Sequence, residues 1–155
     1  MSFTGLHYYD PSWIQQTNET IRAEGCVYGG TAAGVVATVK TAHLGKTVIL
    51  LQPGKHLSGL TTGGLGWTDY GKKDVIGDMA RQLYRDLGHD GAKTEEWHFW
   101  PSTAECVINR MVADAKVPVQ LCQYLDKVEM SGQRISPVTI RIGNSSFNPC
   151  GHDTR

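Results

Sequence analysis

The chain has 155 residues and a mass of 17.0 kDa; 40% of the residues are hydrophobic and 19% are charged, as expected of one soluble domain with its own core. Its 15 basic and 15 acidic side chains cancel, which argues against a nucleic-acid-binding protein. No apolar run approaches the roughly 20 residues of a membrane span, so we expect neither a nucleic-acid nor a membrane partner.

Residues 1–22 form a polar lead-in, within which residues 11–21 favour a short helix. The segment lacks a basic start followed by an apolar stretch, so it does not resemble a secretory signal. The expected location is therefore cytoplasmic.

Residues 26–52 carry the most informative pattern: a short apolar strand, a glycine turn, an amphipathic helix and a second apolar strand. We predict the helix at residues 33–44 and the second strand at residues 47–51. This order is typical of the opening βαβ unit of a dinucleotide-binding domain. On the helix, the residues expected to face the core are Val35, Val36, Val39 and Ala42, and those expected to face solvent are Thr38, Lys40, Thr41 and His43.

The glycine turn is a variant of the dinucleotide-binding fingerprint. The standard form is G-x-G-x-x-G, whereas residues 29–34 read GGTAAG, with Thr31 in place of the middle glycine. Such glycines let backbone N–H groups approach a pyrophosphate at the positive end of the helix. The acidic residue that usually binds the ribose falls at Gln52, whose amide both donates and accepts hydrogen bonds. We interpret the turn as a nucleotide site rather than a purely structural turn.

Residues 53–73 are rich in glycine and show almost no periodicity. A connection of this length is unusual in a compact domain unless it has a function. Loops of this kind in a nucleotide-binding fold typically wrap the ligand.

The second half of the chain predicts two more helices and a β-hairpin. A helix fits residues 75–87, and another begins at Ser102, where Ser102 and Glu105 match a capping box. The remaining elements are a loop at 88–100, a strand at 117–122, hairpin strands at 124–130 and 134–142, and an irregular tail at 143–155.

These elements together predict an α/β fold with a Rossmann-like βαβ core, additional helices and a β-hairpin. We place the domain at residues 23–142, between the lead-in and the tail.

The four cysteines are Cys26, Cys106, Cys122 and Cys150. Their spacing contains no C-x-x-C pair and forms no zinc pattern with the histidines. We expect buried, reduced thiols and no metal site.

Three longer motifs carry a family resemblance. Residues 28–34 match Y-G-G-T-x-A-G, residues 55–69 match K-H-L-x-G-L-T-x-G-G-L-G-W-T-D, and residues 76–85 match I-G-x-x-A-R-x-x-Y-R. With these motifs, residues 22–142 resemble the N-terminal part of the FAD-dependent oxidoreductases whose fold is like glutathione reductase. Within this family the chain is most similar to a bacterial branch that carries these three motifs. That branch commonly has G-G-T at the glycine turn, so Thr31 fits it. Later matching positions are Trp97, Phe99, Pro101, Ala104 and Glu105.

The resemblance implies FAD bound in extended form, with its pyrophosphate over residues 29–34, its adenosine ribose near Gln52, and residues 55–66 along the ribityl chain toward the flavin. The implied activity is flavin-mediated hydride or electron transfer on an unknown organic substrate. The catalytic residues stay unassigned. The candidate cofactor-binding residues are Gly29, Gly30, Thr31, Ala32, Ala33, Gly34, Gln52, Pro53, Lys55, His56, Gly59, Leu60, Thr61, Thr62, Gly63, Gly64, Leu65 and Gly66.

The sequence departs from the family at two positions and in length. Ser58 stands where the family often has glycine, and Ser102 where it often has histidine. Family members run to several hundred residues, and a later segment completes their flavin site. We therefore expect a fragment, a truncated product or half of a split protein, which binds FAD weakly alone and whose missing half is supplied by a partner chain or by self-association.

Two other functions stay open. One is a non-catalytic scaffold or interaction module that needs a partner chain. The other is an NAD(P)-dependent dehydrogenase, which is disfavoured because such an enzyme would continue with further βα units after the second strand. A yellow protein with flavin absorbance would favour the oxidoreductase.

Several loop side chains have both a ligand-binding and a structural interpretation. His56 and Lys55 could contact a phosphate or lie solvated on the loop. Trp67 and Asp69 could line the flavin pocket, or they could be a core anchor and a turn residue.

The same two interpretations apply further along the chain. Arg81 and Arg85 could clamp an anion, although a solvent-exposed charged face is favoured. The aromatic residues Trp97, Phe99 and Trp100 could stack on a ligand, although a hydrophobic plug is favoured. His98 is interpreted as structural.

Overall fold

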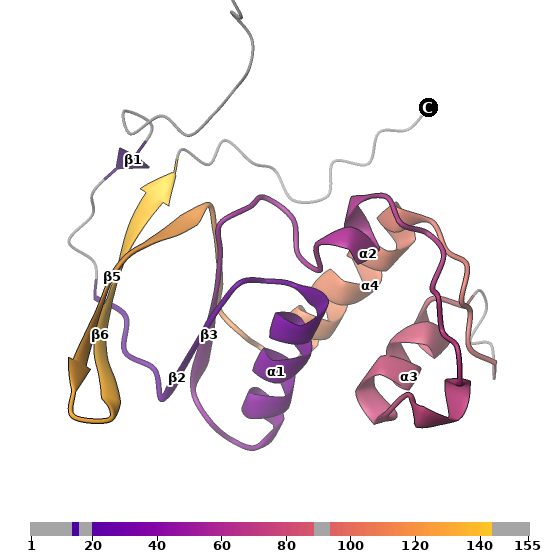
Figure 1. The fold of residues 1–155 in the computed structure, drawn as a ribbon, viewed down its shortest axis with the longest axis horizontal. Helices are drawn as coiled ribbons and strands as arrows, with labels where there is room; N and C mark the ends of the chain where they lie inside the picture. Colours follow the sequence, from indigo (N-terminus) through magenta and orange to yellow (C-terminus); the bar gives the residue numbers. More distant parts are fainter. Residues whose placement is uncertain (1–13, 16–19, 89–93, 144–155) are drawn as a thin grey trace, which may run out of the picture.

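The computed structural model describes residues 14–15, 20–88 and 94–143 (Figure 1). A parallel sheet lies at the centre, with helices on one side and an antiparallel hairpin on the other. This is the predicted α/β fold. The elements in chain order are β1 (Ile14–Gln15), β2 (Gly25–Tyr28), α1 (Ala32–His43), β3 (Val48–Gln52), α2 (Leu60–Gly63), the 3-10 helix η2 (Lys73–Val75), α3 (Asp78–Asp86), α4 (Pro101–Asp114), β4 (Val119–Leu121), β5 (Gln123–Ser131) and β6 (Arg134–Gly143).

The parallel sheet has the order β2-β3-β4. Cys26 of β2 pairs with Ile49 of β3, and Leu50 of β3 pairs with Val119 of β4. The first four residues of β3 are buried, because a central parallel strand is covered on both faces. The predicted strand–turn–helix–strand unit is therefore confirmed.

Helix α1 packs on β2 and β3 along a face that includes Val35 and Val39. The expectation that Thr38 faces solvent is wrong, because its exposed fraction is 0%. The Thr38 hydroxyl donates to the carbonyl of Gly34 at 2.7 Å. This bond within the helix satisfies the hydroxyl, so the side chain can lie in the core without a tertiary partner.

Helices α3 and α4 complete the core beside α1. On α4, the side chains of Val107, Ile108 and Val112 are buried. Helix α3 is shorter than predicted, because η2 precedes it. The buried core cluster comprises Val35, Val39, Val48, Leu50, Leu57, Leu83, Leu87, Ala104, Val107, Ile108, Val112 and Val117.

The predicted capping box at the start of α4 is wrong. The N-cap residue is Trp100, no side chain caps the helix, and Pro101 occupies the first helical position. Proline is favoured there because its ring presets a helical φ and its missing N–H would be unpaired in any case. Ser102 therefore lies inside the helix, and Glu105 is free to contact another segment.

The predicted hairpin is confirmed, with Gly132 at a φ of 62° in its turn. The Leu125 N–H donates to the Tyr28 hydroxyl at 3.1 Å, which joins the hairpin to β2. The helix expected at residues 11–21 is contradicted where the structure describes them, since Ile14–Gln15 is a strand paired with β6. Residues 144–155 of the expected tail lie outside the described residues.

The expectation of buried cysteines holds only for Cys122, because Cys26 and Cys106 are exposed. Strand β2 lies at the edge of its sheet, and its residues alternate in burial, with Cys26 on the more open face. Cys150 lies outside the described residues.

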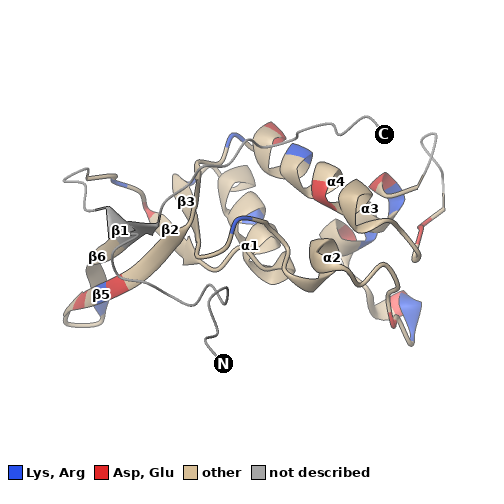
Figure 2. Ribbon diagram, turned by 90° about the horizontal axis from the view of Figure 1, so that it is seen from above, with Lys and Arg blue, Asp and Glu red and all other residues tan. Residues whose placement is uncertain are grey.

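Charges of both signs occur together on α3, α4 and β5 (Figure 2). This mixing is unlike the one-sided basic stripe of a nucleic-acid-binding surface. Among the helices that the structure describes, none has both the length and the apolar character needed to cross a bilayer.

Candidate functional site

The glycine turn joins the end of β2 to the start of α1. Gly29 has a φ of 105°, which lies in the region that favours glycine. Its N–H donates to the Leu51 carbonyl at 2.8 Å, so the turn is tied to β3. Beyond its chain neighbours, no described atom lies within 4 Å of where a Cβ of Gly29 would stand. The turn therefore presents bare backbone to open space.

The other two glycines of the turn permit close packing. A Cβ on Gly34 would lie 2.0 Å from the carbonyl oxygen of Gly29. A Cβ on Gly30 would lie 2.5 Å from Cδ2 of Leu57. Because Gly34 has no side chain, the first turn of α1 can pack against the Gly29 backbone. Because Gly30 has none, the loop that carries Leu57 can pack against the glycine turn.

Thr31 has a role that a glycine could not fill. It is the N-cap of α1, and its Oγ1 accepts from the Gly34 N–H at 3.2 Å. A hydroxyl at the N-cap stabilises a helix by satisfying one of its first unpaired N–H groups. The first turn of α1 contains no acidic residue, so the positive end of the helix is not neutralised by its own side chains.

Gln52 ties the turn to the next loop. Its Oε1 accepts from the Gly30 N–H at 2.7 Å, and its Nε2 donates to the His56 carbonyl at 2.9 Å. A carboxylate at this position could accept the first bond but could not donate the second. The Gln52 amide therefore connects the glycine turn to the following loop through both of its ends.

Replacing Gln52 with glutamate is expected to lower the free energy of unfolding by about 1 kcal/mol, because the carboxylate cannot donate to the His56 carbonyl and repels it. Urea denaturation measures this difference. Gln133→Glu introduces the same charge in the exposed hairpin turn and should change stability little. Equal stability of Gln52→Glu and wild type would contradict a stabilising role for the two Gln52 hydrogen bonds.

Ser58 lies beside the turn in an unusual conformation. Its N–H donates to the Gly30 carbonyl, its φ is 72°, and its exposed fraction is 2%. The positive φ explains why glycine suits this position. Among the described residues, none forms a hydrogen bond with the buried Ser58 Oγ. A buried hydroxyl without a partner is rare, and neither periodicity nor spacing identifies it from sequence.

The glycine-rich loop continues past Ser58 into the short helix α2. Gly59 and Gly64 have positive φ values of 55° and 133°. Leu60 and Leu65 are 71% and 57% exposed, so this side of the loop is apolar and open. A Cβ on Gly66 would lie 2.3 Å from the Phe99 carbonyl oxygen, which makes Gly66 the close contact between the loop and the segment before α4.

His56 links the same loop to α4. Its Nδ1 lies 2.6 Å from Oε1 of Glu105, and the two side chains are 58% and 30% exposed. Glu105 therefore positions the loop instead of capping its own helix. Lys55 lies exposed beside it.

A double-mutant cycle of His56→Ala and Glu105→Ala is expected to give a coupling energy below about 1 kcal/mol, because exposed ion pairs are screened by solvent. Urea denaturation of the four proteins supplies the cycle. A coupling of several kcal/mol would show that the pair stabilises the fold instead of positioning the loop.

The two arginines of α3 clamp a carboxylate of the protein itself. Arg85 lies 3.4 Å and Arg81 lies 3.8 Å from Oε1 of Glu95. Arg81 also donates to the Lys73 carbonyl at 2.8 Å. The anion that the two arginines face is thus an acidic side chain of the same chain, and their side chains are 30% and 43% exposed, which fits the favoured interpretation of a partly exposed charged face.

The aromatic residues near α4 divide into buried and exposed sets. Trp97 is 7% exposed, as expected of a hydrophobic plug. Trp67 is 69% exposed and packs edge-on against His98 with 3.6 Å between ring centroids. Trp67 is therefore not a core anchor, and Asp69 lies exposed after it.

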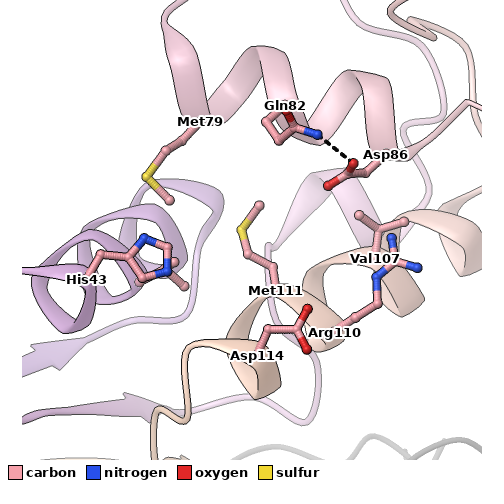
Figure 3. Close-up of a pocket in the computed structure, with 9 residues that line it drawn as sticks. His43, Met79, Gln82, Asp86, Val107, Arg110, Met111 and Asp114 are labelled. Carbon is pink, nitrogen blue, oxygen red and sulfur yellow. Dashed lines mark hydrogen bonds between the residues drawn. The ribbon is translucent and has the colours of Figure 1, made fainter. Parts of the chain in front are cut away.

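Two hollows lie away from the glycine turn. One, of about 230 Å³, lies between α1, α3 and α4 (Figure 3), and its lining includes Met79, Met111 and His43, which lies at the far end of α1. The other, of about 370 Å³, adjoins the glycine-rich loop at Gly66 and is also lined by Trp100.

Of the predicted site residues, the structure brings together residues 29–34, Gln52 and the segment from His56 to Ser58. Residues 59–66 lead away from the turn toward α4. Within the described ranges, no group of three or more His, Cys, Asp or Glu side chains could hold a metal ion.

The sequence model of the family described as FAD dependent oxidoreductase matches residues 25–148. Among solved structures, THI4 from Thermovibrio ammonificans matches with a TM-score of 0.54 and 14% identity, over 76% of this chain and 47% of the other. The bacillithiol disulfide reductase Bdr from Staphylococcus aureus matches with a TM-score of 0.51 and 13% identity, over 76% and 33%.

A flavin monooxygenase from Stenotrophomonas maltophilia also matches, with a TM-score of 0.51 and 15% identity, over 79% of this chain and 34% of the other. At these identities the likeness shows a shared fold. The chain spans less than half the length of each of the three structures. No curated protein matches the sequence.

Proposed function

Because this chain belongs to the FAD dependent oxidoreductase family, we propose that it is the FAD-binding part of a flavin oxidoreductase and that the turn at residues 29–34 holds the FAD pyrophosphate. The observation that carries the proposal is the open backbone at Gly29, followed directly by the N-terminus of α1. Backbone N–H groups and the helix dipole together favour an anion at such a place.

The remaining predicted residues have distinct roles in this proposal. Gln52 holds the turn through the Gly30 N–H and offers its second amide hydrogen to the ribose. Thr31 keeps α1 starting at the turn. The buried Ser58 hydroxyl, which has no hydrogen-bond partner among the described residues, supports a polar group at this place. Pro53, Lys55 and His56 border the cofactor, and residues 59–66 follow it toward the flavin.

FAD supplies hydride and electron transfer when bound, and the protein supplies orientation and exclusion of water. The apolar side chains Leu60 and Leu65 are suited to cover a planar ring and to keep water from it. The substrate is an organic molecule of a class that the cofactor residues do not specify.

The test is a titration of the 155-residue chain with FAD, followed by flavin fluorescence, with size-exclusion chromatography on the same samples. We expect saturable binding weaker than about 1 µM, because the exposed loop encloses little of a ligand. Binding tighter than this would contradict the predicted weakness. A folded chain that binds no FAD at tens of micromolar would contradict the proposal and favour a scaffold or interaction module.

NAD⁺ and NADP⁺ titrated under the same conditions test the nicotinamide alternative. We expect neither to compete with FAD. Competition at concentrations similar to that of FAD would favour a dehydrogenase. A dimer on the column would identify self-association, and a monomer that still binds FAD would show that this chain binds the cofactor without a partner.

A further inference from the structure

An exposed aromatic surface is built by two short segments that pair near the start of α4. The Phe99 N–H donates to the Gly66 carbonyl at 2.8 Å, and the Thr68 N–H donates to the Trp97 carbonyl at 3.1 Å. Trp67 and His98 are opposite residues of this antiparallel bridge. Opposite residues of an antiparallel pair share a face, so their rings meet on the outer side.

Successive side chains of an extended segment point to opposite sides, so the aromatic rings here divide into a set that faces the core and a set that faces solvent. Trp97 points into the protein and is 7% exposed. Trp67 and Trp100 are 69% and 75% exposed. Exposing most of a tryptophan side chain to water is unfavourable because the ring is large and apolar. A patch of such exposed apolar side chains is typical of a binding surface.

The hollow of about 370 Å³ lies against this surface. Its described lining includes the rings of His98, Phe99 and Trp100 and a single carboxylate, that of Glu96, with no lysine or arginine. The wall is therefore aromatic with one negative charge.

The Glu96 carboxylate is held in place. The Glu96 N–H donates to the Tyr84 carbonyl at 2.8 Å, and its Oε1 accepts from the His98 N–H at 3.1 Å. One carboxylate oxygen is thus fixed beside the rings, and the group still carries a full negative charge with acceptor capacity for a ligand. The neighbouring acid, Glu95, is engaged by Arg81 and Arg85 instead.

We propose that this hollow binds an organic ammonium group. Aromatic faces attract a cation through their negative quadrupole, and a fixed carboxylate adds a full opposite charge. The inner side of the same segment already shows the interaction, since Lys73 Nζ lies 3.9 Å from the Tyr70 ring centroid and 5.1 Å from the Trp97 ring centroid. The outer rings carry no such cation from the described part of the chain.

The ligand is expected to be an amine or quaternary ammonium compound with a small apolar body, because rings and one carboxylate line the hollow. A phosphate-bearing or carboxylate-bearing ligand does not fit, since the Glu96 charge would repel it. The site does not depend on bound FAD, and its test is made without the cofactor. It adjoins the loop proposed to border the flavin only at Gly66.

The test titrates the 155-residue chain with choline and, in parallel, with 3,3-dimethyl-1-butanol, which has the same shape without the charge. Tryptophan fluorescence and calorimetry follow the binding at slightly alkaline pH, where ordinary imidazoles are neutral. Choline is expected to bind saturably and about fivefold or more tightly than the neutral compound. Equal binding of the two compounds, or no binding of choline, would overturn the proposal.

Two variants locate the site. Trp100→Leu and Glu96→Gln are each expected to weaken choline binding by about fivefold, while Glu129→Gln removes the same charge from the exposed hairpin and should bind as wild type. Trp100 is so exposed that its replacement should leave the melting temperature nearly unchanged. Wild-type binding by Glu96→Gln would overturn the proposal, as would a chain that self-associates through this face and excludes choline.

Discussion

A Gly29→Ala variant is expected to bind FAD about tenfold more weakly than wild type, or not at all. The added methyl group would stand in the open space in front of the turn, where the proposed pyrophosphate lies. Alanine also resists the φ of 105° at this position, and a residue forced into such a conformation costs about 1–3 kcal/mol. A shift of the turn by this strain would move the N–H groups away from the anion. Flavin fluorescence titration measures the affinity.

Gly45→Ala is the matched control. Gly45 has a φ of 75° and also faces open space, but it lies after the opposite end of α1. It should therefore destabilise the protein to a similar degree and leave the FAD affinity unchanged. If the two variants lose the same affinity, the loss comes from global destabilisation and not from the turn. Unchanged binding by Gly29→Ala would place the cofactor elsewhere.

A Gly34→Ala variant is expected to lower the free energy of unfolding by about 3 kcal/mol. The new Cβ would lie 2.0 Å from the Gly29 carbonyl oxygen, and backbone atoms cannot rotate away as a side chain can. Helix α1 would have to move from β2, which loosens the contacts of Val35 and Val39 in the core. Urea denaturation followed by circular dichroism measures the loss.

Gly63→Ala tests whether the effect is specific to this contact. Gly63 lies in α2, and beyond its chain neighbours and the backbone of its own helix no described atom lies within 4 Å of its ideal Cβ, so the same substitution there meets no obstacle and favours the helix. We expect its stability to equal or exceed that of wild type. A Gly34→Ala protein as stable as Gly63→Ala would mean that α1 adjusts its position without cost.

The candidate site combines elements that are distant in sequence. Gln52 bonds to the turn 22 residues earlier, and Glu105 reaches His56 across 49 residues. These contacts set where the glycine-rich loop lies relative to the turn. A change in either contact is therefore expected to affect FAD binding through the position of the loop, even though the exposed His56–Glu105 pair adds little stability.

The sequence by itself predicted the βαβ unit, the two later helices and the hairpin. Each depends on neighbours a few residues apart: apolar periodicity on α1 and α4, a continuous apolar run in β3, and glycine at the turns. Such local preferences are present before the chain folds. Two of the local errors, Thr38 facing solvent and Ser102 capping α4, concern residues that have two local conformational or packing choices, between which tertiary packing selects.

Only the tertiary structure decided the rest of the site. The two Gln52 hydrogen bonds, the positive φ of Ser58, the pairing of Trp67 with His98 and the partner of Glu105 all depend on segments brought together by folding. A sequence pattern records periodicity along the chain but not the distance between two loops. That distance is set by how the attached elements pack together, because the glycine turn joins β2 to α1 while the glycine-rich loop begins at the end of β3 and contacts α4 through α2.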